Sequence, residues 1–299
     1  MNFPSNPRPA ATVVVLRDSP AGPEVFMVRR HEGTAFMGGA HVFPGGRVDP
    51  ADHEASDAWC DGIAGARAAA ARLNPGASDG AANGASADAV AYHVAAAREL
   101  FEEAGVLLAR DAAGAFVSLA GAADHDRFKQ ARTAVHAGTL SLRALAGREH
   151  LRLALDALVL FAHWVTPPID TRQFDTRFFM TRVPPRQTPA HDDAETTHGA
   201  WVRPADAIAQ SFRGEIVLPP PTHTTLRELE GFRSVAAALA WAGQRRIVRR
   251  MPHLVEQEAK RLLLLPGDPL HPDPAGDERP LETRFVFVDA RWRPEQPGT

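Results

Sequence analysis

The sequence predicts an α/β fold in which a mixed β-sheet carries helices on both faces. Two β-rich runs, residues 11–16 and 25–29, flank a segment rich in proline and glycine at residues 18–23, and this arrangement indicates a β-hairpin. Further β-rich runs follow, mixed with stretches of helical periodicity. Strands and helices in this order favour a sheet between helical layers.

The remaining elements are predicted in chain order. Strands are expected at residues 41–43, 106–108, 158–166, 177–183 and 199–202, with two later edge strands at 262–265 and 284–288. Helices are expected over residues 54–73, 88–104, 124–145 (as one or two helices), 204–212 and 222–242, and a loop over 266–280. One decorated domain would then span residues 8–299, with residues 204–299 as a helical extension packed on the core.

The most informative segment is Arg98-Glu99-Leu100-Phe101-Glu102-Glu103-Ala104-Gly105-Val106. On a helix its three glutamates fall within an arc of about 100°, opposite the apolar side chains. Gly105 follows where the helix is expected to end. Carboxylates this close repel one another unless a divalent cation neutralises them, so the spacing favours a Mg²⁺ or Mn²⁺ site. A solvated, glutamate-rich helix face is the alternative.

A glycine-rich segment upstream favours the metal site over the solvated helix face. His41-Val42-Phe43-Pro44-Gly45-Gly46-Arg47-Val48-Asp49 is predicted to be a short strand that breaks into a loop. Together the two segments resemble the Nudix box, with Gly46 at its first position and Arg98, Glu99, Glu102, Glu103 and Gly105 matching its second half. Asp52 stands where the family pattern has glutamate, and the arginine comes about 38 residues later than in an uninterrupted box.

The interruption, residues 53–88, is expected to be an insertion within the box. Residues 54–73 are rich in alanine and predict a helix, whereas residues 74–84 have little to bury and predict a mobile loop. Ser86 or Asp88 would cap the helix that follows. The insertion is either a lid over the acidic face or a tolerated surface loop, since doubling a loop's length costs only ~0.6 kcal/mol.

The Nudix resemblance implies an α/β/α sandwich that hydrolyses a diphosphate. Glu99, Glu102 and Glu103 would bind Mg²⁺ or Mn²⁺, the carbonyl of Gly46 would complete the metal shell, and Glu102 or Glu103 would also serve as base. Arg98 is placed to orient Glu102 from one turn away. An ordinary ion pair at this spacing, worth ~0.3–0.5 kcal/mol, accounts for Arg98 equally well.

Further candidate residues lie outside the box. Glu195, six residues before Trp201, would by the same resemblance be a general base or an additional metal ligand, and a plain loop glutamate is the alternative. Arginines in the segments expected around the site suit an anionic substrate. They are Arg29, Arg30, Arg47, Arg172, Arg177 and Arg182, of which Arg29, Arg47 and Arg177 are the expected substrate contacts.

Three stretches outside the box indicate a substrate. Residues 36–46, residues 164–167 followed by 173–179, and residues 264–268 are similar to the peroxisomal branch of Nudix hydrolases that acts on coenzyme A and acyl-coenzyme A, a branch that also has a long insertion in its box. The resemblance implies cleavage of coenzyme A into 3′,5′-ADP and a phosphopantetheine. The alternatives are a hydrolase of ADP-ribose, nucleotide sugars or dinucleoside polyphosphates, and a non-catalytic nucleotide-binding module. The complete set of three glutamates favours an enzyme.

Composition argues against several other classes of protein. A net charge of −3 and a pI near 6.5 do not suit a nucleic-acid partner bound through bulk charge. No segment has the character of a signal peptide or a membrane span, and the single Cys60 cannot form an intramolecular disulfide. The end Gln296-Pro297-Gly298-Thr299 lacks a peroxisomal signal, so we expect a cytoplasmic enzyme. Its expected partner is a small-molecule diphosphate, and a homodimer is compatible with the Nudix resemblance.

Overall fold

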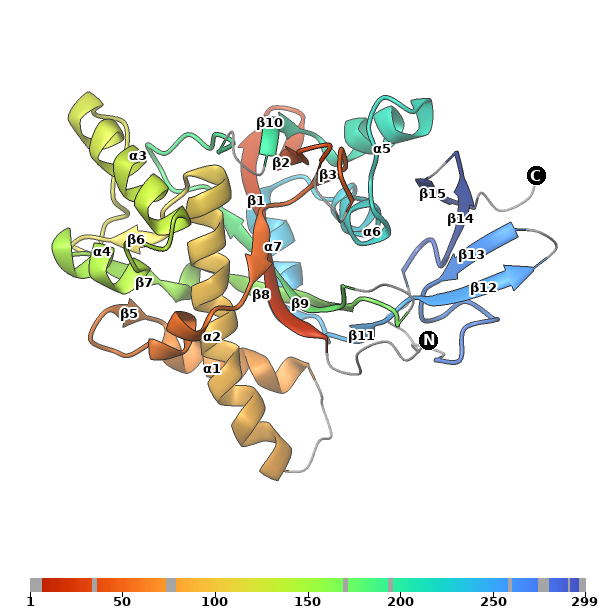
Figure 1. The fold of residues 1–299 in the computed structure, drawn as a ribbon, viewed down its shortest axis with the longest axis horizontal. Coiled ribbons are helices and arrows are strands. Elements are labelled where there is room, and N and C mark those ends of the chain that lie inside the picture. Colours follow the sequence, from red (N-terminus) through yellow and green to blue (C-terminus); the bar gives the residue numbers. More distant parts are fainter. Residues whose placement is uncertain are drawn as a thin grey trace.

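The computed structural model describes residues 7–33, 37–73, 79–168, 172–192, 196–257, 260–273, 280–289 and 291–295, and it leaves the side chains of residues 79–87 undescribed. An eight-stranded mixed sheet lies at its centre, and helices cover both faces of that sheet (Figure 1). The predicted fold class is confirmed. None of the helices in the described part of the chain has the length and apolar character to cross a membrane.

The central sheet has the strand order β10-β2-β1-β9-β8-β11, with β3 beside β2 and β4 beside β1. β1 runs parallel to β9 and β8 runs parallel to β11, while the other pairs are antiparallel. The predicted hairpin joins β1 to β2. The strands are β1 (Arg8–Ser19), β2 (Gly22–Arg30), β3 (His41–Val42), β4 (Gly45–Arg47), β8 (Val159–Val165), β9 (Phe174–Arg182), β10 (Thr196–Val202) and β11 (Arg249–Arg250).

Side chains alternate along β1 and separate two hydrophobic cores. Val13 and Val15 belong to the first core, which α1 (Ile63–Ala69) and α2 (Asp79–Ala104) cover, whereas Val14 and Leu16 belong to the second core, which α7 (Val235–Gln244) covers. All four of these side chains are completely buried. Because successive strand residues point to opposite faces, both faces of the sheet need a helical layer.

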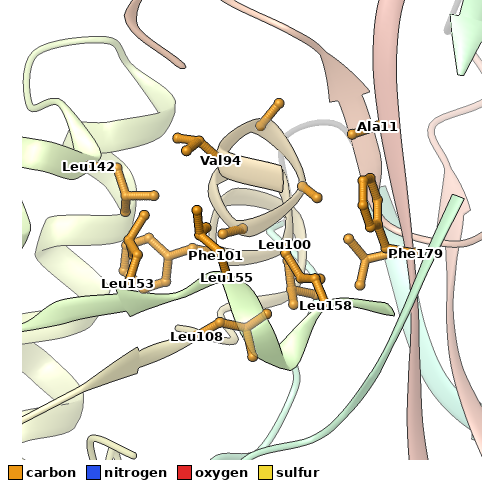
Figure 2. Packing of buried hydrophobic residues seen from close by; sticks show 14 of the residues in the cluster. Ala11, Val94, Leu100, Phe101, Leu108, Leu142, Leu153, Leu155, Leu158 and Phe179 are labelled. Atoms are coloured by element: carbon orange, nitrogen blue, oxygen red, sulfur yellow. The ribbon is translucent and has the colours of Figure 1, made fainter. Parts of the chain in front are cut away.

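Helix α2 packs on the first core through Val94, Leu100 and Phe101 (Figure 2). It ends as predicted, because Gly105 takes the left-handed φ of 65° and its N–H donates to the carbonyl of Phe101 at 3.0 Å. It begins earlier than predicted, since residues 79–84 are helical rather than a loop. Adding residues to an existing helix costs less than starting one, so this segment can be helical although Gly80 and Gly84 are poor helix formers.

The prediction of one helix over residues 54–73 is wrong. This stretch contains β5 (Cys60–Asp61), α1 and the 3₁₀ turn η2 (Ala70–Arg72), after a first 3₁₀ turn η1 (Pro50–Glu54). Gly62 has a φ of 83° and lies against the backbone of Asp156, so the chain turns there instead of continuing a helix. β5 pairs with β7 (Arg152–Ala154), and β7 pairs with β6 (Ala109–Arg110), which replaces the strand predicted at 106–108. Such pairing between distant segments overrides local propensity.

Residues 122–148 form the two helices α3 (Ala122–His136) and α4 (Leu142–Arg148), and the 3₁₀ turn η3 (Leu155–Ala157) follows β7. Farther along lie α5 (Pro204–Arg213) and α6 (Pro220–Leu229). The helix predicted over 222–242 is divided into α6 and α7, and the hydroxyl oxygen of Ser234 caps α7 by accepting from the N–H of Ala237 at 3.2 Å.

The two predicted edge strands do not extend the central sheet. They belong to a separate antiparallel sheet of β12 (His253–Gln257), β13 (Lys260–Leu264), β14 (Arg284–Val288) and β15 (Arg291–Pro294). Residues 204–299 therefore contain both helices and strands, rather than helices alone. α7 and β11 from this part pack on or pair with the central sheet, and one domain over residues 8–299 stays a prediction.

A buried histidine in α2 makes the stability of the protein sensitive to acid. The Nδ1 of His93 lies 2.7 Å from the carbonyl of Ala89, its ring packs edge-on against Phe179, and burial lowers the pKa of His93 from 6.5 to about 4. Between pH 6.5 and 4, His93 therefore takes up a proton in the unfolded chain but not in the folded chain. We expect the free energy of unfolding to fall as pH decreases through this window.

The His93→Phe variant tests this expectation because it cannot take up the proton. Urea unfolding at pH 7 and pH 5 should show that the natural chain loses more stability than the variant on acidification. Equal losses in the two proteins would contradict the prediction.

Candidate active site

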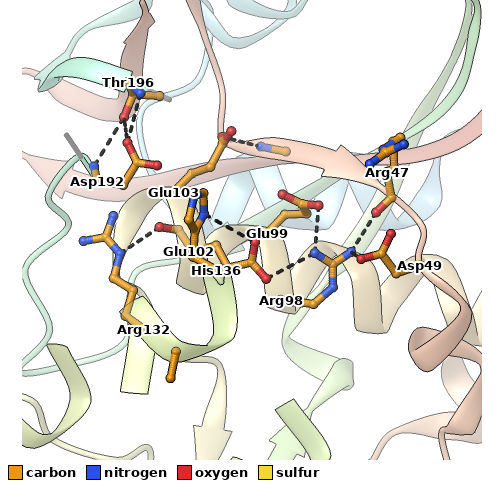
Figure 3. A network of polar contacts seen from close by, with 12 residues as sticks. Arg47, Asp49, Arg98, Glu99, Glu102, Glu103, Arg132, His136, Asp192 and Thr196 are labelled. Carbon is orange, nitrogen blue, oxygen red and sulfur yellow. Dashed lines mark hydrogen bonds and ion pairs between the residues drawn. The ribbon is translucent and has the colours of Figure 1, made fainter. Parts of the chain in front are cut away.

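The C-terminal end of α2 meets β4 at a group of acidic side chains (Figure 3). β4 pairs with β1, which places Gly45 opposite Thr12 and Gly46 opposite Ala11. The N–H of Gly45 donates to Oε2 of Glu103 at 2.9 Å. A Cβ atom on Gly46 would lie 2.5 Å from the carboxyl carbon of Glu99, so the backbone of Gly46 touches that carboxylate. The two halves of the split box therefore form one site.

The exposure of the glutamates distinguishes the two interpretations of this helix face, a cation site and a solvated glutamate-rich surface. Glu102 is 8% exposed and Glu103 is 4% exposed. A face that served only to keep the protein soluble would leave these side chains in water. Buried carboxylates are costly unless hydrogen bonds or charges compensate them. The site is thus built into the interior of the protein.

Arg98 supplies much of this compensation, and each of its N–H groups donates a hydrogen bond. Nε and Nη2 donate to the two carboxylate oxygens of Asp52 at 3.1 and 2.9 Å. Nη1 donates to Glu99 at 2.9 Å and to Glu102 at 3.2 Å, and Nη2 also donates to the carbonyl of Arg47 at 2.7 Å. Arg98 therefore joins α2 to η1 and β4, well beyond the pair with Glu102 that its spacing indicates.

Burial and charge act in opposite directions on these groups. Burial alone would lower the pKa of Arg98, but the hydrogen bonds to Asp52 and the charges of Glu99 and Glu102 outweigh it and raise that pKa. Burial raises the pKa of Glu102, and Arg98 opposes this shift. Arg98 is therefore charged at any working pH, and Glu102 is a more basic carboxylate than one in water.

Asp52 has a role that the sequence showed only as a departure from the Nudix pattern. It is 2% exposed and accepts the N–H of Asp49 at 2.8 Å in addition to the two bonds from Arg98. Asp49 and Asp52 have the spacing of a capping box at the start of η1, which is a signal that the sequence contained. The buried partner of Arg98 thus comes from the loop half of the box.

Helix α3 contributes two site residues that sequence analysis missed. Nε of Arg132 donates to the carbonyl of Glu102 at 2.7 Å, and its Nη2 donates to the carbonyl of Ala190 at 3.0 Å. Nδ1 of His136 lies 3.8 Å from Oε2 of Glu102. The two residues are one helical turn apart, so the sequence indicated a shared face, but nothing local to α3 indicated that α2 lies beside it.

The expected substrate contacts have different surroundings. The carbonyl of Arg47 accepts from Arg98, and the side chain of Arg47 is exposed. Arg29 forms an ion pair with Glu32 at 2.6 Å, and Arg177 pairs with Asp175 and lies over the ring of Tyr92. No contact among the described residues brings Arg29 or Arg177 to the carboxylates. Glu195 lies outside the described residues, so its role stays a prediction.

A family model described as the NUDT19 Nudix domain matches residues 7–229 of this chain. The chain belongs to the NUDT19 Nudix family. It is similar to the human acyl-coenzyme A diphosphatase NUDT19, with 32% identity over 88% of this chain and 76% of the human protein. The protein of that name from Gallus gallus is 29% identical over 85% of this chain and 75% of its own length.

A solved structure supports the same assignment. The crystal structure of a NUDIX hydrolase from Alicyclobacillus acidocaldarius has a TM-score of 0.62 and 28% identity to this chain, and it covers 79% of this chain and 96% of its own. This chain is therefore a Nudix diphosphatase, an enzyme of the hydrolase class.

Nudix hydrolases generally use divalent metal ions, and the donors of this site fit such ions in kind. Carboxylate and carbonyl oxygens are the ligands that hard cations prefer, and the bare Cα of Gly46 lets its backbone approach Glu99. No three His, Cys, Asp or Glu side chains in the described part of the chain already converge as a cation site. In this arrangement Arg98 donates to one oxygen each of Glu99 and Glu102, and the N–H of Gly45 donates to one oxygen of Glu103.

Two cavities border the carboxylates of this Nudix site. A cavity of about 840 Å³ lies between the end of α2, α3 and residues 186–192, and Glu102 is part of its wall. A cavity of about 200 Å³ adjoins Gly45 and has an apolar wall of aromatic and proline side chains, including Phe43, Trp164, Phe178, Pro220 and Trp292. Of the two cavities, the larger one therefore includes a box carboxylate in its wall, and the smaller one reaches the site at Gly45.

The two glycines of β4 predict a matched pair of variants. A Cβ on Gly46 would meet the flexible end of Glu99, whereas a Cβ on Gly45 would overlap the backbone of Ala11 and Thr12. We expect Gly46→Ala to lower kcat about tenfold or more with little change in stability, because Glu99 must move. We expect Gly45→Ala to lower the free energy of unfolding by ~1–3 kcal/mol. Urea unfolding and diphosphatase assays of both variants check this, and a stable, fully active Gly45→Ala enzyme would contradict it.

Proposed function

We propose that this Nudix enzyme hydrolyses the diphosphate of coenzyme A or acyl-coenzyme A, giving 3′,5′-ADP and phosphopantetheine or its acylated form. The observation that carries the proposal is the complete set of box glutamates beside Gly45 and Gly46, with Glu102 and Glu103 buried, in a chain whose relatives are named acyl-coenzyme A diphosphatases. The three glutamates suit the chemistry, and the relatives' names suggest the substrate.

In this proposal Glu99, Glu102, Glu103 and the carbonyl of Gly46 hold Mg²⁺ or Mn²⁺. When bound, such ions neutralise the diphosphate and lower the pKa of a bound water. Glu102 or Glu103 accepts the proton of the attacking water, whose oxygen bonds to one phosphorus while the bridging P–O bond breaks. The leaving phosphate keeps the bond's electron pair. Arg98 is a positioning residue, since it fixes the carboxylates and itself contacts Asp52 rather than open solvent.

The apolar cavity beside Gly45 suits one end of such a substrate. Aromatic and proline side chains form most of its wall, and Thr12 and Arg30 add polar groups. A wall of this kind binds apolar chains with a few polar groups along them, which describes an acylated pantetheine arm. ADP-ribose and nucleotide sugars have no comparable apolar portion, so this cavity favours the coenzyme A proposal over those alternatives.

A substrate panel read by mass spectrometry tests the proposal. Purified protein with Mg²⁺ or Mn²⁺ is given coenzyme A, acyl-coenzyme A, ADP-ribose, a nucleotide sugar and a dinucleoside polyphosphate. We expect release of 3′,5′-ADP from coenzyme A or its acyl form at the highest kcat/KM of the panel. Hydrolysis of another member with no 3′,5′-ADP from any coenzyme A species would overturn the substrate assignment.

A further inference from the structure

The cavity of about 840 Å³ beside Glu102 has a row of basic side chains along its α3 wall. His125, Lys129, Arg132 and His136 follow one another along α3 at spacings of four, three and four residues, and all line the cavity. Residues this far apart on a helix share one face. Arg186 and His191, from a segment distant in the sequence, also line the cavity. Basic groups from two segments of the chain therefore line the cavity.

In the described part of the chain, two of these cations have no side-chain partner. Among the described residues, the side chains of Lys129 and Arg186 form no hydrogen bond or ion pair, whereas Arg132 is bonded to two carbonyls. Lys129 is one of only two lysines in the sequence. Both side chains are thus available to an anion.

The acidic residues of the cavity wall are Glu102, Asp126 and Asp192. Glu102 belongs to the reaction centre, and Oδ1 of Asp192 accepts from both the N–H and the hydroxyl of Thr196, at 2.9 and 2.8 Å. Asp126 is therefore the acid that most directly opposes an anion near Lys129, three residues along the same helix. Removing the negative charge of Asp126 should therefore strengthen the binding of an anion, whereas removing the positive charge of Lys129 should weaken it.

We propose that this cavity binds the 3′-phosphate of the nucleotide half of the substrate, with Lys129 and Arg186 as its cationic contacts. The proposal rests on coenzyme A as the substrate, and it adds that the enzyme recognises this substrate by its 3′-phosphate. His136 lies 3.8 Å from Glu102, so this end of the row of basic side chains reaches the reaction centre. Lys129 lies seven residues away on the same helix, or about 10 Å along its axis. A second phosphate carried on the ribose fits this separation from the diphosphate.

Coenzyme A and 3′-dephospho-coenzyme A form a matched pair of substrates that differ only in this phosphate. We expect the natural enzyme to hydrolyse coenzyme A with a kcat/KM about tenfold or more above that of the dephospho form, mostly through KM. Lys129→Gln and Arg186→Gln should each lower kcat/KM for coenzyme A about tenfold and leave the dephospho substrate within about twofold. Asp126→Asn should lower the KM for coenzyme A.

Lys260→Gln is the control, because it removes the other lysine, which lies on β13 outside the cavity. A binding measurement complements the kinetics. Titration of the metal-free protein with 3′,5′-ADP and with 5′-AMP should show tighter binding of the former, and Lys129→Gln should remove the difference.

The outcomes separate this inference from the proposed function. Equal effects of Lys129→Gln on both substrates, or no preference for coenzyme A in the natural enzyme, would overturn the phosphate site while leaving coenzyme A hydrolysis in place. Absence of coenzyme A hydrolysis would instead overturn the function, and equal binding of the two nucleotides would then also reject the site.

Discussion

Replacing Glu102 or Glu103 by glutamine is expected to lower kcat by about 10²–10⁴-fold and to leave the fold intact. The amide keeps the size of the side chain but loses the charge and the basic oxygen that the proposed reaction requires. Glu103→Gln can still accept the N–H of Gly45 through its amide oxygen, and Glu102→Gln removes only one of the partners of Arg98. Circular dichroism and urea unfolding measure the fold, and release of the product measures kcat.

Glu256→Gln is the matched control, since Glu256 is an exposed glutamate on β12 in the separate C-terminal sheet. It should retain the activity of the natural enzyme. If Glu102→Gln and Glu103→Gln both turned over substrate at the natural rate, the assignment of the reaction to this helix would be rejected.

Replacing Arg98 by methionine is expected to lower the free energy of unfolding by ~3–5 kcal/mol, in addition to reducing activity. Asp52 is 2% exposed and would keep its charge in the interior after losing both bonds from Arg98. The methionine fills much of the space but donates no hydrogen bond. Adding Asp52→Asn to Arg98→Met removes the unpaired charge of the Asp52 carboxylate. The double variant should therefore regain part of the lost stability, which urea unfolding measures.

Arg110 and Asp156 offer a comparison pair of the same chemistry at the surface. Arg110 makes two hydrogen bonds to Asp156, at 2.7 and 2.8 Å, but the side chain of Asp156 is 48% exposed. Water can replace the lost partner there, so Arg110→Met should cost about 1 kcal/mol or less. Equal losses for Arg98→Met and Arg110→Met would show that burial does not govern the contribution of Arg98.

Features determined by nearby residues could be predicted from the sequence. The end of α2 at Ala104 depends on Gly105 within the same turn, and the hairpin of β1 and β2 depends on the segment between them. The glutamates could be placed on one helix face by their spacing alone. The breaks in the predicted helices could not be found in this way, because β5 forms only where β7 lies beside it.

The same distinction applies to the candidate site. Only the resemblance to the Nudix box predicts that Gly46 lies near Glu99. The two residues are 53 positions apart in the sequence, and their contact depends on the pairing of β4 with β1. Arg132 and His136 reach Glu102 through the packing of α3 on α2, which no local pattern indicates. The sequence indicates only that Arg29 and Arg177 lie in segments expected near the site, and the structure gives both arginines carboxylate partners of their own.

The order in which the chain is made has a consequence for α7. The box glutamates are synthesised by residue 103, whereas the helix that covers the second face of the central sheet ends at Gln244. A nascent chain therefore emerges from the ribosome with every box residue present and with Val14 and Leu16 still lacking their helical cover. Apolar surface left open on a partly made sheet promotes aggregation. A fragment that stops at residue 229, where the family match ends, would keep this exposed surface permanently and should be a poor substitute for the enzyme.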